Sequence, residues 1–304
     1  MNLVRRICVV GLFILLMSFQ ASADDFLRGD VNRDGRVDVS DVAELIDYLM
    51  IGEWHDEQAV NIFTVAGVSF NMVKVDAGSF MMGAAADDDE AADRERPAHQ
   101  VTLSGYSIGE TEVTQELWQA VMGYNPSDFT DDPQRPVDYV SWDDCQLFIA
   151  KLNEMTGATF RLPTEAELEF AARGGNLSKG YKYACSDNVD DVAWYEINAY
   201  NVGMNDPDFG PHAVKTKAPN ELGLYDMSGN VMEWCQDYYG LYSNEAQTDP
   251  VGPSSGYGRV TRGGSWGGTA TSCRVSYRGA GTAPSSRGHY RGFRLAQSIH
   301  PIHP

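Results

Sequence analysis

The sequence is short of basic residues and short of cysteine. Its 304 residues include 23 Lys and Arg against 43 Asp and Glu, a net charge of −20, and only 5 cysteines. Because nucleic-acid phosphates require a basic surface, this balance argues against nucleic-acid binding. The chain is long enough to build a core without a dense disulfide framework. Two alternatives remain for the cysteines after the first 23 residues, which are Cys145, Cys185, Cys235 and Cys273. They can form two disulfides, or they can be unpaired buried thiols.

Long apolar runs are missing after the first 23 residues. Residues 1–23 have the pattern of a secretory signal peptide, with Arg5 and Arg6 before an apolar stretch and an Ala-x-Ala cleavage site at 21–23. The stretch is shorter than the roughly 20 residues that span a bilayer. We therefore expect an exported protein, periplasmic or extracellular and not membrane-spanning. Its mature chain would carry 21 basic and 43 acidic residues, a net charge of −22.

A short acidic segment near the N-terminus has the spacing of an EF-hand calcium loop. Counting from Asp30, oxygen-bearing side chains stand at positions 1, 3, 5, 9 and 12, and Gly35 stands at position 6, where the loop turns sharply. Ca²⁺ prefers six to eight oxygen ligands. The predicted ligands are Asp30, Asn32, Asp34, Asp38 and Asp41 through their side chains and Arg36 through its backbone carbonyl. The alternative is a solvated acidic turn before a helix.

The Asp at position 12 and the apolar face that follows, Val42, Leu45, Ile46 and Leu49, make this unit resemble a dockerin repeat. Dockerins bind Ca²⁺ and dock into cohesin modules, so the resemblance implies a cohesin-like partner. Dockerins normally carry two repeats, and the sequence contains one. A calcium-stiffened spacer is therefore an equal alternative.

The next part of the chain shows local signals for regular structure. We expect a linker from Glu53 to about Thr64, then a strand and hairpin over 70–75 and 78–83, and a strand over 101–103. Thr114, Ser141 and Thr164 predict the starts of three helices, which end near Gly123, Gly157 and Arg173. After Gly174, turn-forming and aromatic residues dominate, with only short strand-like runs.

Several ordered blocks between Asn71 and Ala296 resemble the formylglycine-generating enzyme, or sulfatase-modifying-factor, family. The blocks are Glu112-Val113-Thr114, Pro136-Val137, Val140-Ser141-Trp142, 161–167 (RLPTEAE), 173–175 (RGG), 223–227 (GLYDM), 229–231 (GNV), Glu233-Trp234, 262–266 (RGGSW) and 292–294 (GFR). The resemblance implies an irregular α+β domain with a C-type-lectin-like fold and a loop-built surface site. The expected organisation is a signal peptide at 1–23, a dockerin-like unit and linker at 24–60, the family domain at 61–298 and a tail at 299–304.

The family's enzymes oxidise a sulfatase cysteine to formylglycine with O₂ and Cu(I), which two cysteines five positions apart hold after the Gly-Gly-Ser motif. Cu(I) is soft and prefers thiolate ligands. Cys273 and Ser265 match the family's active site, but Gly268 stands where the other cysteine belongs. Met232 stands where these enzymes usually carry tryptophan. These departures argue against copper and against an enzyme, and formylglycine-generating oxidase remains the alternative.

Two further expectations follow from the resemblance. The family binds Ca²⁺ near its Gly-Asn block, and the matching ligands here are Asp226, the backbone of Gly229 and Val231, and Glu233; turn-capping carboxylates are the alternative. A disulfide between Cys235 and Cys273 would leave no copper ligand, and two unpaired buried thiols are its alternative. The Gly-x-Ser-x-Gly pattern at 263–267 lacks the helix that a serine hydrolase needs after it.

The sequence therefore predicts a secreted, non-catalytic binding module for a protein or glycan ligand. Aromatic and Arg side chains are common anchors of recognition surfaces. The candidates are Tyr257, Trp266, Tyr277, Arg278, Arg287, His289, Tyr290 and Arg291. For Trp266 and Phe293 we prefer a core position, and Arg274, Arg278 and Arg294 are expected to donate internal salt bridges to the acidic excess.

Overall fold

The structure is a computed structural model and describes residues 60–299. The chain divides between Ala59 and Val60. The signal peptide at 1–23 and the predicted calcium loop (Asp30, Asn32, Asp34, Arg36, Asp38 and Asp41) therefore lie outside the described residues.

The described unit combines short strands with a few helices, which confirms the α+β prediction. In chain order the elements are β1 (Val60–Val65), β2 (Val68–Val75), β3 (Gly78–Met82), β4 (His99–Leu103), β5 (Tyr106–Gly109), α3 (Gln115–Met122), α4 (Trp142–Thr156), β6 (Phe160–Arg161), α5 (Glu165–Ala172), α6 (Val189–Val192), β7 (Met232–Tyr238), β8 (Gln247–Thr248), β9 (Arg259–Arg262), β10 (Arg291–Gly292) and β11 (Ala296–Ser298).

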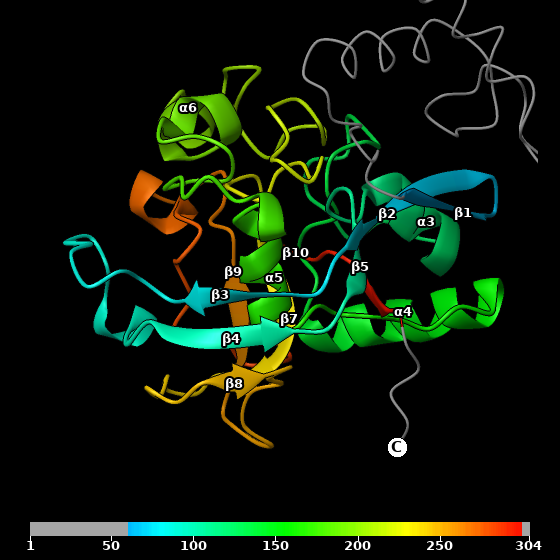
Figure 1. Ribbon diagram of the computed structural model, residues 1–304. Helices are drawn as coiled ribbons and strands as arrows, with labels where there is room; N and C mark the ends of the chain where they lie inside the picture. Colours follow the sequence, from blue (N-terminus) through cyan, green and yellow to red (C-terminus); the bar gives the residue numbers. More distant parts are fainter. Residues whose placement is uncertain (1–59, 300–304) are drawn as a thin grey trace, which may run out of the picture. The chain divides into compact units, whose positions relative to one another are not determined.

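Three sheets bring together strands that are distant in the sequence. The largest has the order β1-β2-β5-β11-β6, and the two smaller ones have the orders β10-β7-β9 and β3-β4-β8. Helix α4 packs on β1, β6 and α3, while α5 packs on β3, β4, β7 and β9 (Figure 1). Helix α5 therefore joins the two smaller sheets from the middle of the unit.

The three predicted helix starts are confirmed. Thr114, Ser141 and Thr164 each accept a hydrogen bond from a backbone N–H in the first turn of the helix that follows, which satisfies a donor that has no partner inside the helix. Gly123 and Gly157 end α3 and α4 in the left-handed conformation that glycine adopts without strain.

Two local predictions were wrong. Residues 60–64 were expected to belong to a linker, but they form β1, whose residues Val60–Val65 pair with 68–73 of β2. The segments over 70–75 and 78–83 were expected to form a hairpin, but β2 pairs with β1 and β5 on its two edges. Both edges of β2 are therefore occupied, and β3 pairs with β4 in another sheet.

Buried ion pairs hold α5 in place. All eight residues of α5 are buried, including Glu165, Glu167 and Glu169. Glu165 binds both Arg262 and Arg278, and Glu169 binds Arg262. Arg274 pairs with Glu95, and Arg294 pairs with Glu233, so the three predicted internal donors are confirmed. Trp266 and Phe293 are buried, as predicted.

Candidate functional site

The Gly-Gly-Ser block follows β9 and turns the chain closely around Cys273. Gly263 and Gly264 have φ values of +91° and +77°, which favour glycine. A Cβ on Gly264 would lie 2.8 Å from the Cys273 Sγ atom and 2.8 Å from the Ser272 carbonyl oxygen. Gly264 therefore lets the backbone approach the thiol. A one-turn helix over Ala270–Cys273 then carries Cys273 into the interior.

Cys273 lies in an apolar environment made by Tyr183, Val192, Ala193 and Tyr195. Burial raises the pKa of its thiol to about 12, and the Ser272 hydroxyl and the Ser265 backbone amide only partly offset this effect. The thiol is therefore protonated at neutral pH. A nucleophile or copper ligand needs the thiolate, which this environment disfavours.

A side chain at the position five residues before Cys273 would require the Ser272 hydroxyl to move. A Cβ on Gly268 would lie 2.5 Å from the Ser272 Oγ atom and 3.3 Å from the Ser265 carbonyl oxygen. The Ser272 hydroxyl donates to the Thr269 carbonyl oxygen over 2.7 Å, which holds it in this place. The second thiolate is thus absent, and a serine hydroxyl lies against the position where its side chain would begin.

The predicted disulfide between Cys235 and Cys273 is wrong, because both thiols are free. Cys235 belongs to the large core cluster with Leu168 and Val260, whereas Cys273 belongs to a separate cluster. Cys145 and Cys185 are free as well. All four cysteines are therefore unpaired thiols, which was the alternative that the sequence left open.

Two of the four residues expected to bind a second Ca²⁺ are buried carboxylates. Asp226 and Glu233 are buried, and the Asp226 Oδ2 atom accepts from the Lys215 backbone N–H over 2.9 Å. Glu233 binds Arg294, with 2.8 Å between Oε1 and Nη2. Among residues 60–299, no cluster of three or more His, Cys, Asp or Glu has metal-binding geometry. The structure therefore brings the predicted carboxylates into one region without completing a site from side chains.

Glu112 is a third member of this group, and the sequence reasoning missed its role. Its Oε1 accepts from the Val231 N–H over 3.0 Å, and its Oε2 accepts from the Asn230 Nδ2 over 2.7 Å. Burial raises its pKa well above the ordinary range, and the negative charges of Asp226 and Glu233 add to the shift. The signal was present in the Glu112-Val113-Thr114 block, which the resemblance left without a function.

The three buried carboxylates of this group outnumber the arginine that they share. Glu112, Asp226 and Glu233 share Arg294 as the guanidinium that interacts with all three. Burial also raises the pKa of Asp226 to about 6. A buried carboxylate without a compensating charge must take up a proton or a cation. The donor chemistry, carboxylates with nearby backbone carbonyls, fits a hard cation such as Ca²⁺.

Next to Gly268 the surface carries aromatic side chains. A Cβ on Gly267 would clash with the Tyr290 ring, so this ring lies directly on the glycine backbone. Tyr290 and Tyr200 both contact the buried Trp266, at centroid distances of 4.8 and 5.6 Å. Tyr290 is 36% exposed and Tyr200 43% exposed. Ile197, in the same π-helical turn (Glu196–Tyr200) as Tyr200, is also exposed.

This π-helical turn is tied to the glycine segment, because the Glu196 N–H donates to the Gly268 carbonyl oxygen over 2.9 Å. Single π turns occur frequently at functional sites. We call the exposed side chains of Ile197, Tyr200 and Tyr290 the aromatic face. The His289 ring stacks on Tyr139 at 4.8 Å, and its Nδ1 lies 2.6 Å from the Asp128 Oδ2 atom.

The other recognition candidates do not gather at this face. Arg278 is buried against Glu165, so its prediction as a surface residue was wrong. Tyr257 is exposed, but its hydroxyl donates to the Ala280 carbonyl on a different loop. Arg287 binds Asp144 with 2.7 Å between Nη2 and Oδ1, and Arg291 packs over Trp234. Tyr277 packs against Arg94.

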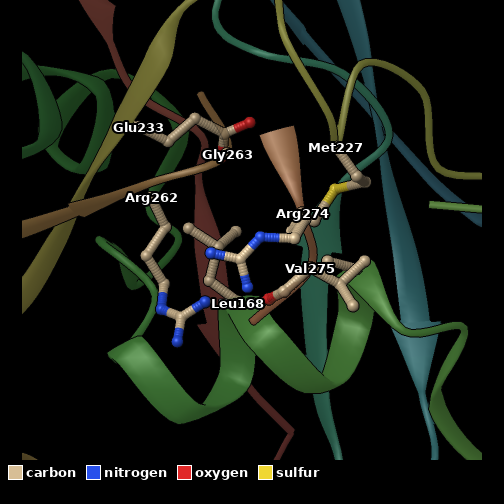
Figure 2. A pocket seen from close by; sticks show the side chains of 8 residues that line it. Leu168, Met227, Glu233, Arg262, Gly263, Arg274 and Val275 are labelled. Carbon is tan, nitrogen blue, oxygen red and sulfur yellow. Dashed lines mark hydrogen bonds between the residues drawn. The ribbon is translucent and has the colours of Figure 1, made fainter. Parts of the chain in front are cut away.

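The interior beside Glu233 contains no ligand-sized space. Figure 2 shows Arg262 extending toward α5 while the Glu233 carboxylate points away from it. The cavity that Glu233, Arg262 and Arg274 line measures about 10 Å³, which holds one water molecule at most. This cavity therefore has no room for an organic ligand.

Comparison with known proteins decides the family. Residues 68–299 match the sulfatase-modifying factor enzyme 1-like domain. The chain belongs to this family. Residues 28–66 match the dockerin type I domain, which confirms the second resemblance; that match runs through β1.

Named relatives of this sulfatase-modifying-factor-like protein differ in their descriptions. The "Chaperone protein LppX" of Paenibacillus barcinonensis is 34% identical over 254 residues, covering 70% of this chain and 84% of the relative. The "Formylglycine-generating enzyme" of Streptomyces coelicolor is 30% identical over 252 residues, covering 64% and 78%. Of these two relatives, one is named as a chaperone and the other as an enzyme.

Solved structures agree with the fold. "Treponema denticola variable protein 1" is 35% identical, with a TM-score of 0.70, covering 79% of this chain and 99% of that chain. PvdO from Pseudomonas aeruginosa is 26% identical, with a TM-score of 0.65, covering 81% and 100%. None of the helices within residues 60–299 has the length and apolar character needed to cross a membrane.

Proposed function

We propose that this protein is exported and binds a ligand through the aromatic face without oxidising it. One observation carries the proposal: Gly268 supplies no second thiolate, and Ser272 lies against its backbone. A single buried thiol with a raised pKa does not fit a cuprous centre, which takes thiolate ligands. The loop-built, C-type-lectin-like description of the site belongs to the same proposal.

The alternative function is formylglycine generation. Cys273 and Ser265 still match the family's active site, and a similar chain carries that enzyme's name. The test uses the purified mature protein, a chromogenic Cu(I) competitor, and mass spectrometry of a Cys-x-Pro-x-Arg peptide incubated with O₂. We expect neither copper retention nor aldehyde. Micromolar or tighter copper affinity together with aldehyde would establish the oxidase instead.

A gain-of-ligand variant sharpens this test. Gly268→Cys combined with Ser272→Ala restores a thiol and removes the hydroxyl that lies in its way. We expect this double variant to retain Cu(I) more strongly than the parent. Thr269→Cys is the matched control, because it adds a thiol one residue away on the exposed side of the same turn.

The ligand that the aromatic face favours is a protein. Aromatic anchors beside an exposed aliphatic side chain, here Ile197, are typical of protein-binding surfaces. The test compares Tyr290→Ala and Tyr200→Ala with Tyr257→Ala, an exposed tyrosine on another loop. Proteins crosslinked to the parent should be lost with the first two variants and kept with the third. Retention of the same glycan on an array by all variants would contradict this assignment.

Calcium has two proposed places. The loop from Asp30 to Asp41 is the first, supported by the dockerin match, and it would dock a cohesin-like module. The second is formed by Asp226, the backbone of Gly229 and Val231, and Glu233, with Glu112 as a further negative group. Ca²⁺ there would neutralise buried charge and fix the turn. A calcium-induced folding signal that disappears in an Asp30→Ala, Asp34→Ala variant tests the first place.

A further inference from the structure

A second cavity lies away from the aromatic face, where the end of β7 meets the N-terminus of α5. It measures about 320 Å³ and is lined by β7, α5, β4 and the loop over 240–253. This volume is within the range of small-molecule sites. Its rim is apolar, since the lining residues Leu241 and Val251 are 85% and 66% exposed. Its floor contains buried polar residues, among them Asp237 at 4% and His99 at 3%.

Asp237 is the polar group of this floor that lacks a cationic partner. Its Oδ2 accepts from the Glu165 backbone N–H over 2.9 Å, at the N-terminus of α5. Its Oδ1 lies beside Gly252, where a Cβ would approach within 3.1 Å. No ion pair links Asp237 to a Lys, Arg or His among residues 60–299.

The neighbouring acids are already paired. Glu165 binds Arg278 through two charge-assisted hydrogen bonds of 2.7 and 2.6 Å. Glu167 binds Arg161 in the same bidentate manner, at 2.6 Å for each bond. The carboxyl group left for a ligand is therefore that of Asp237. A buried carboxylate without a partner is costly, which a cationic ligand would relieve.

The aromatic rings of the cavity each carry an arginine on one face. Arg259 lies over the Tyr238 ring at 3.4 Å. Arg278 lies over the Tyr242 ring at 4.1 Å, and the His99 ring lies 4.8 Å from Tyr242. The cavity thus offers a carboxylate at its floor and aliphatic side chains at its rim, and the Arg278 guanidinium that also lines it is paired with Glu165.

We propose that this cavity binds a primary ammonium group on an aliphatic stem, either a small alkylamine or the end of a lysine side chain. The ammonium donates to Asp237, and the stem packs between Leu241 and Val251. This site is separate from the aromatic face and does not depend on whether Cys273 is catalytic.

Protonation of Asp237 provides an independent readout. Burial raises its pKa to about 8, and the charges of Glu165 and Glu167 from α5 add to this effect. Arg161 of β6 and Arg259 of β9 also interact with it, and His99 of β4 shares the cavity. An ammonium prefers the ionised carboxylate, so its binding below pH 8 releases a proton. The affinity then rises by up to about tenfold per pH unit as the pH approaches the pKa.

The test titrates the mature protein with n-butylammonium and, separately, with Nα-acetyl-lysine N-methylamide. Changes in the NMR chemical shifts of the protein report binding. The salt concentration is about 0.15 M, which screens surface charge. We expect saturable binding of the amine, weaker by at least about tenfold for 1-butanol, which lacks the charge. Binding of the lysine derivative as well would identify a protein side chain as the source, and binding of the amine alone would identify a small molecule. Equal binding of 1-butanol would overturn the proposal.

Asp237→Asn removes the charge and keeps an acceptor for the Glu165 N–H. We expect it to weaken n-butylammonium binding by at least about tenfold and to abolish the proton release that calorimetry in two buffers measures. Glu245→Gln, an exposed acid on the same loop, is the matched control and should change nothing. Unchanged binding by Asp237→Asn contradicts the proposal.

A second variant keeps the test decisive if Asp237→Asn does not fold. Leu241 is almost fully exposed, so Leu241→Ala leaves the core intact. In the parent, affinity should rise about fourfold per methylene from ethyl- to butylammonium. Leu241→Ala should flatten this increase, and an unchanged chain-length dependence would exclude the proposed position of the stem.

Discussion

Two groups of buried carboxylates differ in how their charge is balanced. In the α5 group, Glu165, Glu167 and Glu169 each have an arginine partner. In the group around Asn230, the carboxylates of Glu112, Asp226 and Glu233 share Arg294. The balanced group therefore serves the fold, because its charges are satisfied within the chain. The unbalanced group depends on what the solution supplies, a proton or a cation.

The largest effect is expected from breaking the balanced group. Arg262→Ala would leave Glu165 and Glu169 with a buried charge that has lost a partner. We expect a loss of about 3–5 kcal/mol in the free energy of unfolding, measured by urea denaturation. A loss below about 1 kcal/mol would mean that the α5 group contributes no more than a surface pair.

A smaller effect is expected from calcium in the unbalanced group. In an Asp30→Ala, Asp34→Ala background, which silences the dockerin-like loop, Ca²⁺ at 100 times its Kd should add about 2.7 kcal/mol. Asp226→Asn should remove this gain, which thermal unfolding with and without a chelator measures. If calcium stabilises the background protein and its Asp226→Asn variant equally, the cation binds elsewhere.

Asp237 sharpens the comparison, because it lies at the edge of the balanced group without a cation. Its pKa is raised to about 8, above the ordinary value of 3.8. The folded state therefore holds a proton that the unfolded state releases, and this group's stabilisation is lost as the pH rises from about 4 to 8. Asp237→Asn should flatten the pH dependence in that window, and urea midpoints at pH 5 and 8 measure it. An unchanged slope would contradict the raised pKa.

The smallest effect is expected at the surface. Arg287 is half exposed and binds Asp144. Solvent screens this pair, so Arg287→Ala should leave the free energy of unfolding nearly unchanged. The same urea experiment measures it, and a loss comparable to that of Arg262→Ala would remove the distinction between buried and exposed pairs.

Local chemistry made part of this fold predictable. The starts of α3, α4 and α5 follow from Thr114, Ser141 and Thr164, because a cap depends on residues three positions apart. Arg274, Arg278 and Arg294 were also predicted as internal donors, since an acidic chain with few basic residues pairs them where charge is buried. The family and its departure at Gly268 follow from ordered motifs.

Long-range contacts explain what the sequence left undetermined. The pairing of β3 with β4 rather than β2 depends on β5 occupying the other edge of β2. The separation of Cys235 from Cys273 depends on two different core clusters. Burial raises the pKa values of Glu112 and Asp237, and carboxylates distant in the chain add to the effect. No local pattern encodes these contacts.

The position of the Ser272 hydroxyl has a consequence for which side chains residue 268 can carry. A cysteine at residue 268 would displace that hydroxyl and break its bond to Thr269. A smaller residue at position 272 would open the space, at the loss of one hydrogen bond. The two positions are therefore coupled, and the cost of a thiol at residue 268 depends on the residue at 272.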